Sequence, residues 1–323
     1  MEYRHLGGAG VRVSAISLGS WLTYGGSVED NAAIACIHKA YDLGINFFDT
    51  ANGYRRGEAE TVVGRALKDF PRASYVLATK VFFPMGEGPN DRGLSRKHIM
   101  EQCEASLKRL GVDYVDLYQC HRYDPETPLD ETLRALDDLV SQGKILYAGV
   151  SEWSATQIGD AVALADRRNL HRLASNQPVY NMFQRYIERD VIPLCEREGI
   201  GQIVFSPLAQ GVLTGKYKPG QQPEAGTRAA DPESNMFMQQ VMKDEVLEKV
   251  QQLQGVAQEA GYSLAAMAIA WTLRQPNVSS AIIGASRPQQ VEENAKAVDV
   301  RLTDDVLKRV DEVLGDTIQY APR

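Results

Sequence analysis

The 323-residue chain has few of the features that mark a secreted, membrane or metal-binding protein. Its four cysteines, Cys36, Cys103, Cys120 and Cys195, are scattered and form no CxxC motif, so we expect reduced thiols and a cytoplasmic location. The first residues, MEYRHLGGAG, carry charges where a secretory signal would need an apolar run. No apolar stretch is long enough to cross a bilayer, so we expect no membrane insertion.

Histidine pairs and excess positive charge are also absent. The five histidines form no HxH or HExxH motif, so we expect no protein-bound metal site. The formal net charge of −7 argues against a nucleic-acid partner, which favours a basic face. The net charge does not exclude an anionic small ligand, because local charge can oppose net charge.

Short apolar runs alternate with amphipathic helical stretches along the chain. Most runs are rich in Val, Ile, Leu or Phe, as buried parallel strands are. They span residues 15–19, 46–50, 75–80, 115–121, 146–151, 173–178, 202–207 and 280–286. Repeated strand–helix alternation predicts right-handed βαβ units, and eight runs predict an α/β fold of the (β/α)8 TIM barrel type, which the chain length suits. A doubly wound sheet is the main alternative, but no GxGxxG follows the first run.

Capping signals place helices between the runs. Residues 30–44 carry apolar side chains at helical spacing. Ser95 is expected to cap a helix that Gly111 closes. Thr127, followed by a first-turn proline, is expected to cap another, and Ser154 begins a capping-box spacing.

Two regions fall outside the repeat, and a final helix follows it. The GGAG sequence between EYRHL and VRVS predicts a β-hairpin before the barrel. Residues 214–240, rich in Gly, Pro, Gln and charge, are expected to form a long loop of the kind that often acts as a lid. Thr303 is expected to cap an additional C-terminal helix over residues 303–314. We find no linker, so residues 1–323 are expected to form a single domain.

Polar side chains stand where the predicted strands end, which is where a barrel of this kind has its active site. They are Asp49, Lys80, His121, Ser151, Asn176, Gln177, Ser206 and Ser286. Strand alternation is expected to turn Asp49, Lys80 and His121 into one mouth. One charged strand end is usually only solvated, but three of complementary chemistry, with Tyr54 in the adjoining loop, indicate a site.

Tyr54 has a chemical role in this arrangement. An unperturbed tyrosine has a pKa near ~10 and is a poor acid at neutral pH. A nearby Lys80 ammonium is expected to lower that pKa, with Asp49 keeping Lys80 protonated and His121 bonding the substrate oxygen. Such an acid suits protonation of a developing alkoxide. The four residues therefore indicate carbonyl reduction, with the hydride coming from a cofactor.

The same four residues match, in order and barrel position, the tetrad of the aldo-keto reductases. The chain resembles this family from YRHLG near the start to SAIIGASRPQQVEEN near the end. The segments RGLSRKHI (92–99), YNMFQR (180–185) and SPLAQGVLTGKY (206–217) are similar to the branch that contains the voltage-gated potassium channel β subunits and their bacterial relatives. The resemblance implies the barrel fold, oxidoreductase activity on aldehydes or ketones, and NADPH or NADP+ as the cofactor. The channel subunits tend to have asparagine at the position of His121 and arginine at that of Glu152, so the chain departs from that branch at these two positions.

The resemblance also implies which residues hold the dinucleotide across the barrel mouth. Ser151, Asn176 and Gln177 are expected at the nicotinamide carboxamide, with Phe205 stacked on the ring. The pyrophosphate and its surroundings are expected at Ser206, Leu208, Lys216 and Arg228. The adenosine end is expected at Gly284, Ser286, Arg287, Gln290, Glu293 and Asn294. The remaining expected cofactor contacts are Trp21, Asp49, Pro207 and Gly211.

These cofactor residues also have structural interpretations. Phe205 fits a simple core position, Lys216 and Arg228 fit solvated loop charges, and Asn176 and Gln177 fit caps on strand-end backbone groups.

The helix start after the eighth run predicts the choice of nicotinamide. Pro288 suits a first helical turn, so the free N–H groups there favour an anion, and Arg287 adds a fork suited to phosphate. We therefore expect NADPH, which carries a 2′-phosphate, to be preferred over NADH. The alternative is that Ser286 is only a helix cap and Arg287 only a surface charge.

Residues at the mouth are expected to line the substrate pocket. They are Trp21, Tyr54, Phe82, Phe83, His121, Arg122, Tyr123 and Trp153. The aromatic side chains favour an apolar or aromatic aldehyde and Arg122 favours an anionic group such as a phosphate, so the substrate stays open.

Three functions are weighed. The leading prediction is an NADPH-dependent aldehyde or ketone reductase with Tyr54 as general acid, whose partner is a small-molecule carbonyl substrate. The alternative is a slow-turnover NADPH-binding regulatory or channel-associated β-like subunit, which His121 disfavours. A barrel isomerase or lyase for phosphorylated sugars would use Lys80 but would not need Tyr54. The branch often forms tetramers or larger rings, so homo-oligomerisation is left open.

Overall fold

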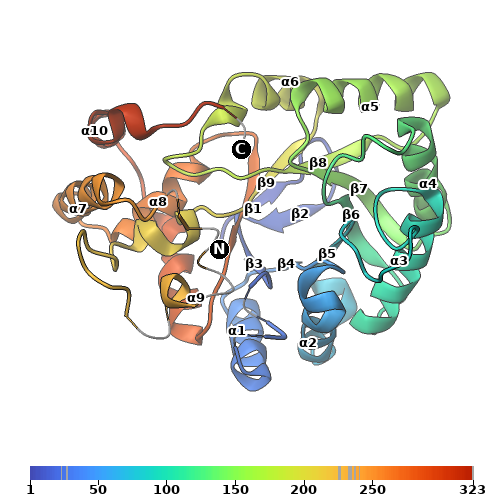
Figure 1. Cartoon of the computed structure of the whole chain (residues 1–323), viewed down its shortest axis with the longest axis horizontal. Coiled ribbons are helices and arrows are strands. Elements are labelled where there is room, and N and C mark those ends of the chain that lie inside the picture. The colour runs from blue at the N-terminus through green and yellow to red at the C-terminus, as the bar shows by residue number, and fades with distance from the viewer. Residues whose placement is uncertain are drawn as a thin grey trace.

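Eight parallel strands close into a barrel with helices arranged around it (Figure 1). The computed structural model describes residues 1–22, 24–26, 28–224, 227–231, 235, 238–239 and 241–321. The barrel strands are β3 (Ile16–Gly19), β4 (Phe47–Asp49), β5 (Val76–Val81), β6 (Val115–Cys120), β7 (Ile145–Ser151), β8 (Leu173–Gln177), β9 (Gly201–Val204) and β10 (Val278–Ile283). Each strand pairs with the next along the chain, and β10 closes the ring against β3. The predicted (β/α)8 barrel is confirmed, and the doubly wound sheet is wrong.

A hairpin closes the amino-terminal end of the barrel. Strands β1 (Tyr3–His5) and β2 (Arg12–Ser14) pair in antiparallel fashion, as the sequence predicted. Leu6 and Val13 of this hairpin are fully buried and pack with the barrel residues Phe47, Ala78 and Leu117. Burial of such side chains contributes about 1.5–3 kcal/mol each. One end of the barrel is thus filled by apolar side chains, which leaves the carboxyl ends of the strands to form a site.

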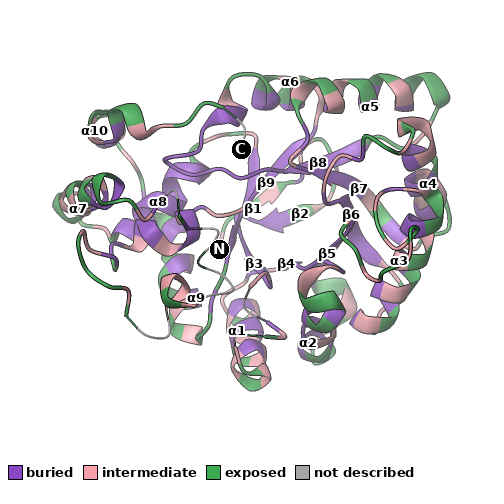
Figure 2. Cartoon of the chain, viewed as in Figure 1, coloured by how far each residue is buried: buried purple, intermediate pink, exposed green. Residues whose placement is uncertain are grey.

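Helices cover the outside of the barrel, with their buried faces turned inward and their exposed faces outward (Figure 2). They are α1 (Asp30–Asp42), α2 (Glu58–Leu67), α3 (Arg96–Leu110), α4 (Leu129–Ser141), α5 (Ala155–Arg168), α6 (Val191–Glu198), α8 (Leu264–Leu273) and α9 (Pro288–Ala295). Among the described residues, no helix is both long and apolar enough to span a bilayer.

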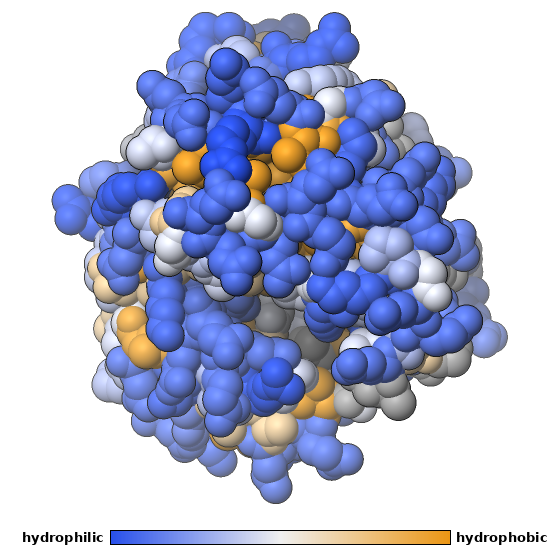
Figure 3. Space-filling model, turned by 90° about the vertical axis from the view of Figure 1, so that its left-hand side faces the viewer, coloured by the Kyte–Doolittle hydropathy of each residue, from blue (hydrophilic) through white to orange (hydrophobic). Residues whose placement is uncertain are grey.

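Two further helices, α7 (Asp244–Glu259) and α10 (Asp304–Leu314), lie against each other outside the strand–helix repeat. The Lys249 ammonium donates to the Leu314 carbonyl at 2.8 Å, and Arg309 pairs with Glu259 at 2.8 Å. The outer face on this side of the molecule is mainly hydrophilic (Figure 3). The C-terminal helix was predicted, whereas α7 was not named from the sequence.

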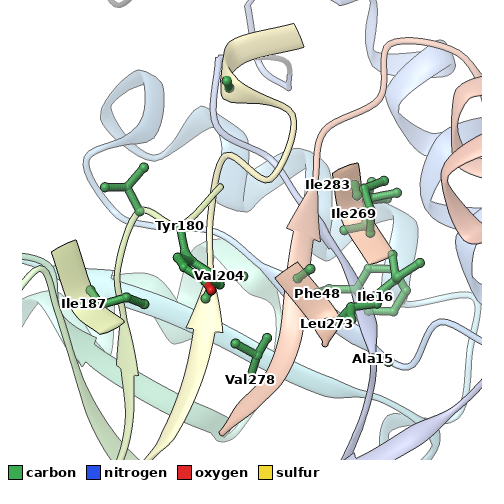
Figure 4. Packing of buried hydrophobic residues seen from close by; sticks show 14 of the residues in the cluster. Ala15, Ile16, Phe48, Tyr180, Ile187, Val204, Ile269, Leu273, Val278 and Ile283 are labelled. Carbon is green, nitrogen blue, oxygen red and sulfur yellow. The ribbon is translucent and has the colours of Figure 1, made fainter. Parts of the chain in front are cut away.

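The main core lies between the strands and the helices. Figure 4 shows Ile16, Phe48 and Ile283, from β3, β4 and β10, gathered with Ile269 and Leu273 of α8. All five are buried. This packing holds the strand ends in fixed positions relative to one another.

Most predicted helix boundaries are confirmed. Ser95 accepts from the His98 N–H, and Ser154 forms a complete capping box. Thr303 caps α10 by accepting from the N–H of the third helical residue.

The cap predicted at Thr127 is wrong. Helix α4 begins at Leu129 with Pro128 as its N-cap residue and no side-chain cap. The Thr127 hydroxyl donates instead to the Asp124 carboxylate at 2.8 Å, because the preceding loop brings that stronger acceptor close.

The loop predicted over residues 214–240 follows β9 and a 3-10 helix over Ala209–Thr214. A second 3-10 helix spans Arg228–Ala230. Residues 225–226, 232–234, 236–237 and 240 of the predicted lid lie outside the described residues.

Candidate active site at the carboxyl ends of the strands

A cavity of about 2040 Å³ extends across the carboxyl ends of the strands. Tyr54 and His121 line one part of it, and the start of α9 lines another. Pockets for one small ligand usually measure roughly 300–1,000 Å³, so this cavity has room for a dinucleotide together with a substrate.

Asp49, Lys80 and Tyr54 form a continuous hydrogen-bonded chain at the cavity wall. The Lys80 ammonium lies 2.5 Å from the Asp49 carboxylate and 3.2 Å from the Tyr54 hydroxyl. It also donates to the Thr50 carbonyl at 2.9 Å, which uses its third N–H. Lys80 is 0% exposed. The ammonium is therefore held between the carboxylate and the phenol.

The second oxygen of Asp49 is held by two amides. The Gln177 side chain donates to it at 2.8 Å and the Gln119 side chain at 3.3 Å. Gln177 was predicted to contact the cofactor, whereas the part played by Gln119 was missed. A polar residue in the middle of an apolar strand run was the available signal for it.

The net effect on the pKa of Tyr54 differs from the prediction. Withdrawal from water raises the pKa of Tyr54, Lys80 lowers it, and Asp49 raises it again, with a net value above the ordinary one. The expected effect of Lys80 is present, but desolvation outweighs it. Tyr54 is therefore a protonated phenol at neutral pH.

Lys80 and His121 also have shifted pKa values. Burial lowers the pKa of Lys80, but the opposing effects of Asp49 and then Tyr54 are larger together. The net pKa of Lys80 is raised, so the lysine is charged. Burial, followed by the charges of Lys80 and Arg122, holds the pKa of His121 well below its ordinary value. His121 is therefore a neutral imidazole at neutral pH.

His121 lies among aromatic rings. Its ring centroid is 5.5 Å from that of Tyr54 and 4.8 Å from that of Phe83, edge to face in both cases. Its Nδ1 atom is buried and has no hydrogen-bond partner within the described structure. Arg122 donates to the His121 carbonyl at 2.5 Å and lies over the Phe83 ring.

The turn after Tyr54 has an unusual backbone. Arg55, Arg56 and Gly57 all have positive φ, of 49°, 51° and 96°. A side chain at Gly57 would meet the Arg109 side chain at 2.6 Å. Arg109 in turn donates to the fully buried Glu60 at 2.6 Å. The Arg109–Glu60 pair therefore packs directly under the turn that presents Tyr54.

The expected cofactor residues, with the exception of Asn176, all line the cavity. They are Trp21, Asp49, Ser151, Gln177, Phe205, Ser206, Pro207, Leu208, Gly211, Lys216, Arg228, Gly284, Ser286, Arg287, Gln290, Glu293 and Asn294. The Ser151 hydroxyl donates to the Gln177 carbonyl at 2.8 Å, which leaves its lone pairs to accept. These residues line one continuous cavity, which runs from the end of β7 to α9.

Gln210, which the sequence analysis missed, links two parts of this wall. Its amide N–H donates to the Ser206 hydroxyl at 2.6 Å, and its carbonyl accepts from the Arg228 guanidinium. Ser206 and Gln210 have positive φ, of 55° and 61°. The bend after β9 thus brings the serine, the glutamine and the arginine together at the cavity.

Asn176 and three predicted pocket residues do not line the cavity. The Asn176 side chain is buried and donates to Gln202 at 3.0 Å, because successive residues of a strand point to opposite faces. Trp153 is 1% exposed and packs edge to face on Tyr123. Phe82 and Tyr123 pack partly against the main core. Trp21, Phe83 and Arg122 do line the cavity.

Comparisons with known proteins agree with this geometry. The model of the family described as "Aldo/keto reductase family" matches residues 15–315. The chain is 45% identical over 319 residues to a "Probable voltage-gated potassium channel subunit beta" of Arabidopsis thaliana, covering 97% of each chain. It is 44% identical to a protein of the same description from Oryza sativa subsp. japonica, again over 97% of each chain.

Proposed function

The chain belongs to the aldo/keto reductase family, and on that premise we propose that it is an NADPH-dependent oxidoreductase that reduces aldehydes or ketones to alcohols. The observation that supports this most is the Lys80 ammonium, hydrogen-bonded to both Asp49 and Tyr54 at the wall of a cavity large enough for a dinucleotide.

Tyr54 is the general acid in this proposal. Its raised pKa means that the phenol carries a proton at neutral pH. Giving up that proton leaves a tyrosinate 3.2 Å from the Lys80 ammonium, which stabilises the new negative charge. Asp49 holds the ammonium in place, and Gln119 and Gln177 hold Asp49.

His121 orients the carbonyl group. As a neutral imidazole it offers one N–H to the carbonyl oxygen without competing with Tyr54 as the acid. The rings of Tyr54 and Phe83 pack edge to face against the imidazole and restrict its orientation. The carbonyl oxygen therefore lies between the imidazole and the phenol.

The cofactor, when bound, supplies a hydride to the carbonyl carbon. Ser151 and Gln177 are proposed to hold the nicotinamide carboxamide and Phe205 to pack on the ring, while Lys216 and Arg228 hold the pyrophosphate. These five residues line the same cavity as Tyr54.

A panel assay tests the proposal. The purified chain is mixed with NADPH and with aldehydes, ketones or sugar phosphates in turn, and the absorbance of NADPH is followed. Substrate-dependent loss of the NADPH absorbance is expected with at least one carbonyl compound. Conversion of a sugar phosphate without any NADPH consumption would contradict the proposal and favour an isomerase or lyase.

A second candidate function rests on the descriptions of the relatives, which name potassium channel β subunits. In that case the chain is a regulatory subunit that binds NADPH tightly and turns it over slowly. Tight NADPH binding with no faster consumption for any carbonyl compound of the panel would favour this candidate.

A further inference from the structure

Glu152 is a cavity-lining carboxylate with no role in the chemistry described above. It directly follows Ser151 at the end of β7, and its φ of 56° lies in the left-handed region. Its N–H donates to the Gln177 carbonyl at 3.2 Å. A glutamate held in that backbone conformation costs free energy of order 1–3 kcal/mol, so the surrounding structure must enforce its position.

Two neutral hydrogen-bond donors hold the Glu152 side chain in place. One carboxylate oxygen of Glu152 accepts from the Val179 N–H at 2.5 Å and from the Tyr186 hydroxyl at 3.1 Å. Burial, and then the Glu152 carboxylate itself, raise the pKa of Tyr186, so this hydroxyl remains a donor. Across the described ranges of the chain, Glu152 forms no ion pair. The carboxylate stands at the cavity wall without a salt bridge among the described residues, and the Arg122 charge reaches Tyr186 beside it.

Two cations stand near the proposed position of the carbonyl oxygen, and Asp49 pairs with one of them, Lys80. Lys80 and Arg122 stand at the ends of β5 and β6, beside Tyr54 and His121. Glu152 stands between the ends of β7 and β8, beside Ser151 and Gln177. The positive groups are thus on the side where the carbonyl oxygen gains negative charge. The negative group is on the side assigned above to the nicotinamide.

We infer that the Glu152 carboxylate stabilises the positively charged nicotinamide ring of NADP+ and thereby sets the redox preference of the site. The inference rests on the proposed function. In the proposed reduction, the carbonyl carbon gains a hydride with its two electrons from NADPH, which becomes NADP+, and the carbonyl oxygen takes the Tyr54 proton. Only the oxidised ring carries a positive charge, so only it is attracted by the carboxylate.

The attraction between the Glu152 carboxylate and the ring also affects hydride transfer. Positive charge develops on the ring as the hydride leaves it, so a carboxylate already fixed beside the ring favours hydride transfer toward the carbonyl. The two hydrogen bonds to Val179 and Tyr186 keep the charge in position without neutralising it.

Equilibrium binding tests the inference without any turnover. The Kd values of NADP+ and NADPH are measured by calorimetry for the wild type and for Glu152→Gln, which keeps an acceptor oxygen for the same two donors. The ratio of the NADP+ Kd to the NADPH Kd should rise about tenfold in the variant, since one negative charge has been removed from the end of the cavity proposed for the nicotinamide. A tenfold change corresponds to about 30 mV in the midpoint potential of the bound cofactor.

A matched control comes from the other end of the cavity. Glu293 lines the cavity on α9, where the adenosine end is proposed to lie. Glu293→Gln should leave the ratio of the two Kd values unchanged, because NADP+ and NADPH are identical there. Glu152→Arg should raise the ratio beyond that of Glu152→Gln, which provides a second measurement if the glutamine variant folds poorly.

The binding measurements distinguish failure of the Glu152 inference from failure of the proposed function. If the wild type binds both dinucleotides and Glu152→Gln shifts both Kd values equally, Glu152 is only a strand-end cap and the inference is overturned while the proposed function stands. If the wild type binds neither dinucleotide, the proposed function and the inference fail together.

Discussion

Burial decides the ionisation of the side chains at the barrel mouth. Lys80 is withdrawn from water yet charged, because Asp49 lies 2.5 Å from its ammonium. His121 is withdrawn from water with two cations nearby, so it is neutral. Tyr54 is protonated for the same reason of desolvation. One charged donor, one neutral donor and one protonated acid therefore meet in a small volume.

The first residue-scale prediction concerns the acid. Tyr54→Phe removes the phenol proton and should lower kcat by about 10²–10⁴-fold, the usual contribution of one general acid. NADPH binding should persist, since the phenol is not among the proposed cofactor contacts. Steady-state kinetics and a calorimetric Kd check both points. Turnover near that of the wild type would contradict the mechanism.

The second residue-scale prediction concerns how the stability of the fold depends on pH through His121. His121 has a lowered pKa in the folded state, against an ordinary value of 6.5. Below pH 6.5 the unfolded chain takes up a proton that folded His121 resists, so this residue's stabilising effect is present above pH 6.5 and lost as the pH falls. The wild type should lose up to about 1.4 kcal/mol per pH unit relative to His121→Asn in this acidic range.

Urea unfolding at several pH values, on wild type and His121→Asn side by side, measures this difference. The asparagine variant should also keep NADPH binding while kcat falls, because the imidazole orients the substrate rather than the cofactor. Parallel pH profiles of stability for the two proteins would show that His121 is not held neutral by the fold.

At the scale of single elements, the site depends on how each strand ends. Alternation along β4, β5 and β6 brings Asp49, Lys80 and His121 to one side. The turn after β4 then presents Tyr54 through a run of three positive φ values. The Arg109–Glu60 pair supports that turn from α3 and α2.

Gly57→Ala should therefore destabilise the protein and disturb Tyr54. The alanine would hold a φ of 96° and meet the Arg109 side chain at 2.6 Å. We expect a loss of about 1–3 kcal/mol from the backbone alone, with a lower kcat. Gly111→Ala is the matched control, since Gly111 has a φ of 68° and nothing within 4 Å.

Thermal melts and kinetics on both glycine variants check this. The Gly111 variant should lose stability but keep kcat, because a side chain at Gly111 would meet nothing within 4 Å and would leave the Arg109 contact with Gly57 in place. If both variants lose kcat alike, the effect is general instability and the supporting role of Arg109 is wrong.

The start of α9 allows a prediction about the cofactor. Pro288 stands at its first turn, and Arg287 precedes it without a side-chain cap bond. A charge-assisted hydrogen bond to a 2′-phosphate is worth roughly 1.5–3 kcal/mol. Arg287→Ala should therefore weaken NADPH binding about tenfold or more and leave NADH binding nearly unchanged. Arg309→Ala, on α10, is the control, and equal losses for both cofactors would rule out a 2′-phosphate contact.

At the scale of the whole molecule, the cavity belongs to no single element. Its walls come from strand ends around the barrel, the bend after β9, the loop with Lys216 and Arg228, and α9. These parts are joined through the barrel, whose other end is filled by Leu6 and Val13. A dinucleotide that spans the cavity would link them further.

NADPH should accordingly stabilise the whole fold. At a free concentration of about 100 times its Kd, a ligand bound only to the native state contributes about 2.7 kcal/mol. Thermal melts should show the increase, and hydrogen exchange should slow most in residues 214–224, in 227–231 and at the start of α9. Helices α7 and α10 serve as the internal reference. Protection confined to the barrel strands would show that the loop does not contact the cofactor.

The sequence by itself determined the periodic features. Eight apolar runs separated by helical stretches specify a closed parallel barrel, because each run can be buried on both faces only when helices cover the outside. It also determined that Asp49, Lys80 and His121 meet, since all three end strands of that barrel. Ser154 and Thr303 were identifiable as caps because capping acts over three residues of chain.

Only the tertiary structure decided the properties that depend on distant neighbours. Gln177 reaches Asp49 across 128 positions of sequence, and Asn176 turns to Gln202 because its strand neighbour already faces the mouth. The direction of the Tyr54 pKa depends on how much water the assembled wall removes, against which the charge of Lys80 is the smaller effect. The effects of burial and of neighbouring charges on a pKa depend on the folded arrangement, because they arise only when the eight strand ends lie together.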